Sequence, residues 1–234
     1  MTYSGVVDGP YLQQVKGVQY SFRVFLGRLD NVNEDPGKYY SKTEESSERV
    51  EQDDFSSKQI QTPSFSPLSS LLLSTSPTRL YQTVIYLSPS DYHRFHSPAS
   101  WTVIKRRHFP GKLYSVAPSV VKRIPGLFHT NERVAFLGRW THGFFAMVAV
   151  GATNVGSIKV HFDKELSTNL KDTDESVTEK IYRDPINFTK GDEFGYFNFG
   201  STIVLIYEAP VDTIIEDEQM RRVEMGQRMW ILNH

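Results

Sequence analysis

The chain has 234 residues, and its 26 Lys and Arg against 27 Asp and Glu give a formal net charge of -1. This balance provides no overall field that argues for nucleic acid, so any basic binding surface must be local. The absence of cysteine excludes disulfide scaffolds, thiolate nucleophiles and cysteine metal sites.

The first half of the chain predicts strands interrupted by one polar insertion. Residues 9–27 alternate β-favouring side chains between glycines, which predicts a strand-rich opening. Residues 34–67 are rich in Ser, Glu, Gln and Asp, and we expect a disordered insertion there. Residues 80–87 form an apolar run between two prolines, typical of a buried strand, and the polar cluster DYHRFH follows at residues 91–96.

The second half predicts more strands around a second polar loop, at residues 164–190. The strongest strand signal is STIVLIYE, and the last segment, around Ile231, can add one more strand. The pattern predicts mostly β structure with a few short helices. Together with the family resemblance described below, it implies a mainly β (α+β) fold, with a single catalytic domain over residues 1–234 and a sandwich-like or barrel-like core. The remaining strand signals are residues 133–138, 144–152 and 156–162.

Two short motifs contain residues suited to chemistry. Gly200 and Ser201 lie where flexible backbone meets an apolar strand, so Ser201 is a candidate nucleophile, although Gly-Ser before a strand is usually only a turn. His93 and His96 fall on opposite faces if their segment is a strand and on one face if it is a helical turn. They resemble half a metal site, but no HExxH pattern accompanies them, so we expect no metal; a structural role for either is the alternative.

A set of strings in a fixed order makes the sequence resemble the phosphatidylserine decarboxylase family. The resemblance covers most of the chain, and the two polar loops fall between its motifs. The strings are QVKGVQYSFRVFLG (14–27), YLSPSDYHRFHSP (86–98), RRHFPGKLYSV (106–116), NERVAF (131–136), VGATNVGSI (150–158) and GDEFGYFNFGSTIVLIYEAP (191–210).

The resemblance implies self-cleavage between Gly200 and Ser201, which yields a β chain of residues 1–200 and an α chain of residues 201–234. It implies His96 as the base for Ser201 and Asp8 as the acid that orients His96, as in an Asp-His-Ser triad. Ser201 would become a pyruvoyl group, the only cofactor expected.

The same resemblance implies that the pyruvoyl ketone forms a Schiff base with phosphatidylserine and accepts the electrons left by carbon dioxide. His93 would handle the substrate and return a proton to carbon. The alternative is a family member that does not mature and acts as a phospholipid-binding module. The sequence leaves the oligomeric state open, a homo-oligomer included.

Because the implied substrate is a bilayer lipid, we expect contact with a membrane. Residues 104–128 interleave basic and aromatic side chains, which suits an anionic interface, although a plain solvated basic loop is the alternative. The longest apolar run, residues 144–150, is far shorter than the roughly 18 residues of a membrane span. The motif FGST is closer to the mitochondrial and bacterial type, which implies the mitochondrial inner membrane, with a targeting and anchoring segment absent from this chain.

Overall fold

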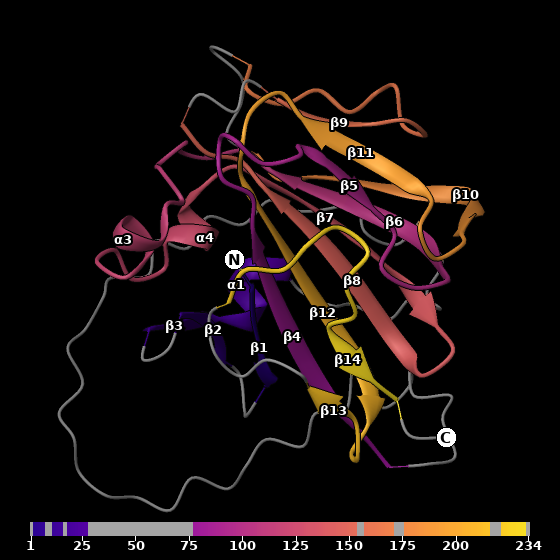
Figure 1. Cartoon of the computed structure of the whole chain (residues 1–234). Helices are drawn as coiled ribbons and strands as arrows, with labels where there is room; N and C mark the ends of the chain where they lie inside the picture. The colour runs from indigo at the N-terminus through magenta and orange to yellow at the C-terminus, as the bar shows by residue number, and fades with distance from the viewer. Residues whose placement is uncertain are drawn as a thin grey trace, which may run out of the picture.

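The structure is a computed structural model that describes residues 2–7, 11–15, 18–27, 77–153, 157–170, 176–215 and 221–232 (Figure 1). The insertion expected at residues 34–67, and Asp8, lie outside the described residues.

Seven antiparallel strands form the main sheet, in the order β1-β4-β12-β8-β7-β6-β10. Strand β12 lies between β4 and β8 and is buried on both faces, which explains why its sequence is continuously apolar instead of alternating. Its first residue, Thr202, pairs with Tyr86 and Val150, so Ser201 lies at the end of a central strand. The strands are β1 (Thr2–Val6), β4 (Thr78–Tyr86), β6 (Trp101–Phe109), β7 (Arg133–Trp140), β8 (Gly143–Val150), β10 (Thr178–Phe188) and β12 (Thr202–Pro210).

A smaller sheet packs on one face of the main sheet through aromatic side chains. It has the order β5-β11-β9, formed by β5 (Arg94–His96), β11 (Glu193–Phe197) and β9 (Ile158–Val160). Phe194 of β11 stacks on Trp101 of β6 at 5.9 Å between ring centroids and meets Phe136 of β7 edge-on at 5.0 Å. The two layers confirm the mainly β, sandwich-like prediction.

Short elements cover part of the opposite face: β2 (Tyr11–Val15), β3 (Val18–Ser21), and the helices α1 (Phe22–Leu26), α3 (Pro118–Val121) and α4 (Leu127–Thr130). The expectation of extended backbone up to residue 27 is wrong for α1. The Ser21 side chain caps this helix by accepting from the Val24 N–H, and Gly27, at φ 76°, ends it. At the C-terminal end, β13 (Ile214–Ile215) pairs with β14 (Trp230–Ile231), which confirms the strand expected there.

Two charged segments contain strands. The polar segment 164–190, expected to be a loop, contains β10, and the basic segment 104–128, for which a solvated loop was the alternative to membrane contact, begins within β6. The charges of the two strands are compatible with the sheet because they pair across it: Lys105 and Arg107 of β6 both reach Glu179 of β10. Strand β10 is an edge strand, which explains its exposed, polar sequence.

The aromatic residues expected at an interface are also partly buried. Phe109 and Phe128 belong to the core, whereas Tyr114 is exposed. Among the residues that the structure describes, no helix has both the length and the apolar character needed to cross a bilayer.

Candidate functional site

The serine at the start of β12 is fully buried and held by backbone groups. The Ser201 hydroxyl donates a hydrogen bond to the carbonyl oxygen of Val150, the last residue of β8. The Ser201 carbonyl oxygen accepts from the Leu87 N–H at 2.7 Å. The backbone contact extends the pairing of β12 with β4 by one residue, and the hydroxyl contact ties the Ser201 side chain to the end of β8, so the sheet itself holds Ser201 in place.

The backbone around Gly200 leaves no room for a side chain. A Cβ at this position would lie 2.5 Å from the carbonyl oxygen of Leu87 and 2.7 Å from the carbonyl carbon of Ser88. Because these are backbone atoms, they cannot turn aside as a side chain could. The turn that supplies them is itself fixed, since the Asp91 carboxylate accepts from the Ser88 N–H at 2.8 Å. Gly200 is therefore required by close packing.

His93 lies near the segment that precedes Ser201. Its backbone carbonyl accepts from the Phe197 N–H at 3.0 Å, and its ring meets the ring of Phe199 edge-on, with centroids 5.7 Å apart. Phe199 is 37% exposed. The Nδ1 atom of His93 is buried and has no hydrogen-bond partner among the described residues. This nitrogen is therefore a buried polar atom whose hydrogen-bonding capacity is not used by the described residues.

His96, on β5, has both ring nitrogens in hydrogen bonds. Nδ1 lies 2.9 Å from the carbonyl oxygen of Gly191, which can only accept, so Nδ1 carries the proton. Nε2 then accepts from the Tyr92 hydroxyl at 2.9 Å, and the two rings stack with centroids 5.8 Å apart. The basic nitrogen of His96 is thus Nε2, and its lone pair accepts the hydrogen bond from Tyr92.

The structure places His93 beside the segment that precedes β12, but it does not connect the candidate residues directly. His93 contacts Phe199, two residues before Ser201, but no hydrogen bond joins His96 to Ser201 within the described part of the chain. Asp8 lies outside the described residues. Sequence reasoning did not assign a role to Tyr92, to the Gly191 carbonyl or to the turn at residues 88–91. Only the turn has a sequence signal, the Ser-Pro-Ser-Asp string.

Comparison with known proteins places the chain among decarboxylases. The family model described as phosphatidylserine decarboxylase matches residues 1–230. The chain therefore belongs to the phosphatidylserine decarboxylase family.

Curated relatives agree with this assignment. The chain is 43% identical to the mitochondrial phosphatidylserine decarboxylase proenzyme of Rattus norvegicus, over 96% of this chain and 52% of the rat protein. It is 38% identical to the mitochondrial proenzyme 1 of Schizosaccharomyces pombe, over 95% of this chain and 60% of that protein. With proenzyme 1 of Arabidopsis thaliana, also mitochondrial, it shares 41% identity over 85% of this chain and 45% of the plant protein. The chain thus spans about half the length of these relatives.

Proposed function

We propose that this chain cleaves itself between Gly200 and Ser201 and then converts phosphatidylserine to phosphatidylethanolamine and carbon dioxide. The observation that carries the proposal is the buried Ser201 hydroxyl, which follows a glycine that admits no side chain, in a chain whose relatives are named proenzymes. The relatives' names also favour a mitochondrial location, and we place the chain at the inner membrane.

Cleavage begins when the Ser201 hydroxyl attacks the carbonyl carbon of Gly200. A base takes the hydroxyl proton, the amide bond to the Ser201 nitrogen breaks, and that nitrogen gains a proton as an ester forms. Loss of the Ser201 α-proton then expels the Gly200 carboxylate and leaves dehydroalanine. Water converts dehydroalanine to a pyruvoyl group with release of ammonia. The Ser201 hydroxyl must first leave the Val150 carbonyl, because its proton points there in the uncleaved chain.

His96 is the proposed base. Its Nε2 holds the required lone pair, but the Tyr92 hydroxyl has to give way before Nε2 can accept a proton from Ser201. Asp8 is the proposed orienting acid and would replace the Gly191 carbonyl as the acceptor for Nδ1–H. Maturation of Asp8→Asn at the wild-type rate would remove Asp8 from this role.

The surroundings of Ser201 fit a small ketone. The Thr202 hydroxyl oxygen is buried without a hydrogen-bond partner among the described residues, so a polar group adjacent to the new chain end is unsatisfied. The pyruvoyl group would supply a carbonyl that takes the substrate amine and accepts the electron pair left by carbon dioxide. His93 would hold the substrate beside Phe199 and deliver a proton to carbon, for which its free Nδ1 is suited.

The proposed activity is tested by release of carbon dioxide from phosphatidylserine by the purified chain. We expect release that stops after treatment with phenylhydrazine, which reacts with ketones, and none from phosphatidylcholine. Release that survives complete carbonyl modification would contradict a pyruvoyl mechanism. A chain that never matures, but still binds phospholipid, would support the binding-module alternative.

A further inference from the structure

Five exposed side chains lie on the segment that joins β6 to β7, and we call them the docking face. Tyr114 is 45% and Ile124 38% exposed, and Lys112, Lys122 and Arg123 are exposed as well. None of these three cations forms an ion pair with a described residue. The sequence from residue 104 to residue 131 contains no Asp or Glu, so the segment itself supplies no acid to neutralise them.

Buried amide side chains hold the docking face in position. The Gln14 Nε2 group donates to the carbonyl oxygens of Val121 and Ile124, at 2.7 Å each, which satisfies carbonyls that the end of α3 would otherwise leave open. The Asn131 Nδ2 group donates to the carbonyl oxygens of Tyr114 and Gly151, at 2.8 Å each. The exposure of Ile124 and Tyr114 is thus fixed by contacts beneath them, and the exposed residues form a preorganised surface.

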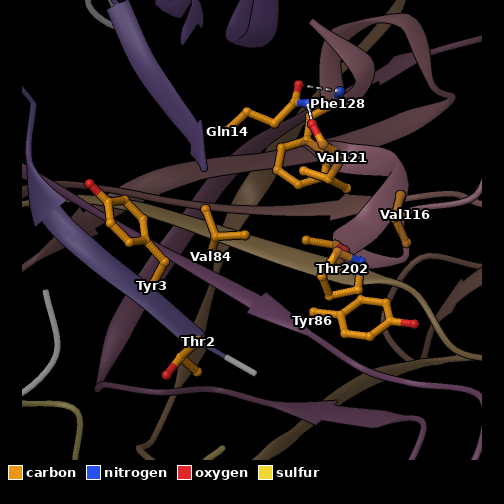
Figure 2. A pocket seen from close by; sticks show the side chains of 10 residues that line it. Thr2, Tyr3, Gln14, Val84, Tyr86, Val116, Val121, Phe128 and Thr202 are labelled. Atoms are coloured by element: carbon orange, nitrogen blue, oxygen red, sulfur yellow. Dashed lines mark hydrogen bonds between the residues drawn. The ribbon is translucent and has the colours of Figure 1, made fainter. Parts of the chain in front are cut away.

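A small pocket lies between the segment that carries the docking face and the proposed cleavage site. Figure 2 shows an apolar pocket whose walls include Val121 and Phe128 on one side and Tyr86 and Thr202 on the other. Its cavity volume of about 20 Å³ suits roughly one water and no lipid chain. The pocket therefore does not hold an acyl chain, but Val121 of the segment and Thr202, the neighbour of Ser201, line the same small cavity.

A second connection passes through the end of β8. Gly151, held by Asn131, directly follows Val150, whose carbonyl oxygen accepts from the Ser201 hydroxyl. The segment that carries the docking face and the site of cleavage therefore share one strand end.

We propose that the docking face binds the headgroup layer of an anionic bilayer and so brings the end of β12 to the lipid surface. Charge complementarity favours this partner, because three cations without an ion pair to any described residue lie on the same segment as Ile124. Ile124 is an aliphatic residue that can enter the interface, and Tyr114 suits the headgroup level. The inference rests on the proposed function, because docking brings the site to its substrate only if that substrate is a bilayer lipid. The docking itself does not depend on any chemistry at Ser201.

The test measures binding of the full chain to phosphatidylcholine vesicles with and without phosphatidylglycerol, an anionic lipid that the proposed reaction does not consume. We expect binding only with phosphatidylglycerol, weakened by salt. Each cation near such a surface contributes roughly fivefold in affinity, so the double variant Lys122→Ser, Arg123→Ser should bind roughly 25-fold more weakly. Ile124→Ser should weaken binding at low and high salt alike, because its contribution is apolar.

A matched control uses the edge strand β10, on the other side of the molecule in Figure 1. Ile181 is 49% exposed and Arg183 is exposed, so Ile181→Ser, Arg183→Ser removes an aliphatic residue and a cation from another surface. We expect this control to bind like the wild type. Unchanged binding of the docking-face variants, or equal loss in the control, would overturn the proposal.

Turnover of a soluble short-chain phosphatidylserine separates this proposal from the proposed function. A wild-type chain that binds anionic vesicles but releases no carbon dioxide from the soluble lipid would overturn the function and leave docking supported. A chain that releases carbon dioxide, but binds vesicles equally well with and without the docking-face substitutions, would overturn docking alone.

Discussion

The Ser201 hydroxyl donates its hydrogen bond to the carbonyl oxygen of Val150, at the end of the ladder between β12 and β8. The uncleaved chain therefore holds its proposed nucleophile with its proton engaged by the sheet. In this state the proposed base, His96, is bonded to Tyr92 and Gly191 instead. In the proposed mechanism, maturation therefore requires the Ser201 hydroxyl to leave Val150 and the His96 Nε2 atom to leave Tyr92.

Replacing Tyr92 by Phe should not slow maturation. The substitution removes the hydroxyl that competes for Nε2 of His96 and keeps the ring that stacks on it. We expect cleavage at the wild-type rate or a few-fold faster, whereas His96→Ala should block it. The rate is followed on denaturing gels after synthesis of the chain. Cleavage more than about tenfold slower in Tyr92→Phe would mean that the hydroxyl takes part in the reaction, as a lost proton-transfer group typically costs at least that much.

Replacing His93 by Ala should separate maturation from turnover. His93 is proposed to act only on the lipid, so the backbone cut should be unaffected while carbon dioxide release falls by about 100- to 10,000-fold. Mass spectrometry first confirms two fragments and a blocked new chain end, and turnover is measured afterwards. Near wild-type turnover in the processed variant would make His93 structural. Failure to process would mean that His93, which contacts Phe199, serves Ser201 in place of His96.

Gly200→Ala should impair cleavage although it removes none of the proposed catalytic side chains. The added Cβ would approach the Leu87 carbonyl oxygen to 2.5 Å, so the scissile backbone must move. Gly5→Ala is the matched control, because its new Cβ would meet only the Tyr3 side chain, with the nearest atom at 3.2 Å. We expect cleavage to be at least about tenfold slower in Gly200→Ala, corresponding to a displacement that costs 1.4 kcal/mol or more, and unchanged in Gly5→Ala. Equal rates would show that close packing at Gly200 is irrelevant.

The buried carboxylate of Asp163 should make stability depend on acid pH. Burial alone would raise the pKa of Asp163, but hydrogen bonds from Arg106, Lys180 and Tyr182 outweigh it and lower the pKa to about 2. A lowered pKa means that the stabilisation is complete above the unfolded value, near pH 4, and is lost as the pH falls from there towards 2.

Asp163→Asn should therefore destabilise the fold by about 3 kcal/mol at neutral pH, because it leaves the buried Arg106 charge without its partner. Unfolding by denaturant is measured in the Ser201→Ala background, which keeps one chain. Asp184→Asn on the exposed side of β10 is the control, with less than about 0.5 kcal/mol expected. A similar loss in both variants, or the same acid sensitivity in Asp163→Asn as in its parent, would contradict this account.

Sequence patterns predicted strands whose residues are buried along the whole length of the strand. Strand β12 was predicted from its apolar run. The roles of Ser201 and both histidines, which the order of motifs implied, remain predictions. Strand β10 was missed because its charges are matched by β6, far away in sequence. The role of Gln14 was equally inaccessible, since the carbonyl of Val121 that it binds lies 107 residues further along the chain. Local composition carries no information about polar groups that pair with residues far away in the sequence.

The most direct test of the central claim is the intact mass of the purified chain beside that of Ser201→Ala. We expect the wild type to yield two fragments whose masses correspond to residues 1–200 and 201–234, the second beginning with a pyruvoyl group in place of Ser201. The variant should give a single species near 26.8 kDa with no decarboxylase activity. Ser90→Ala, on the turn beside Gly200, controls for loss of a nearby hydroxyl and should mature normally. An uncleaved wild type that nevertheless releases carbon dioxide, or a cleaved Ser201→Ala, would contradict the account.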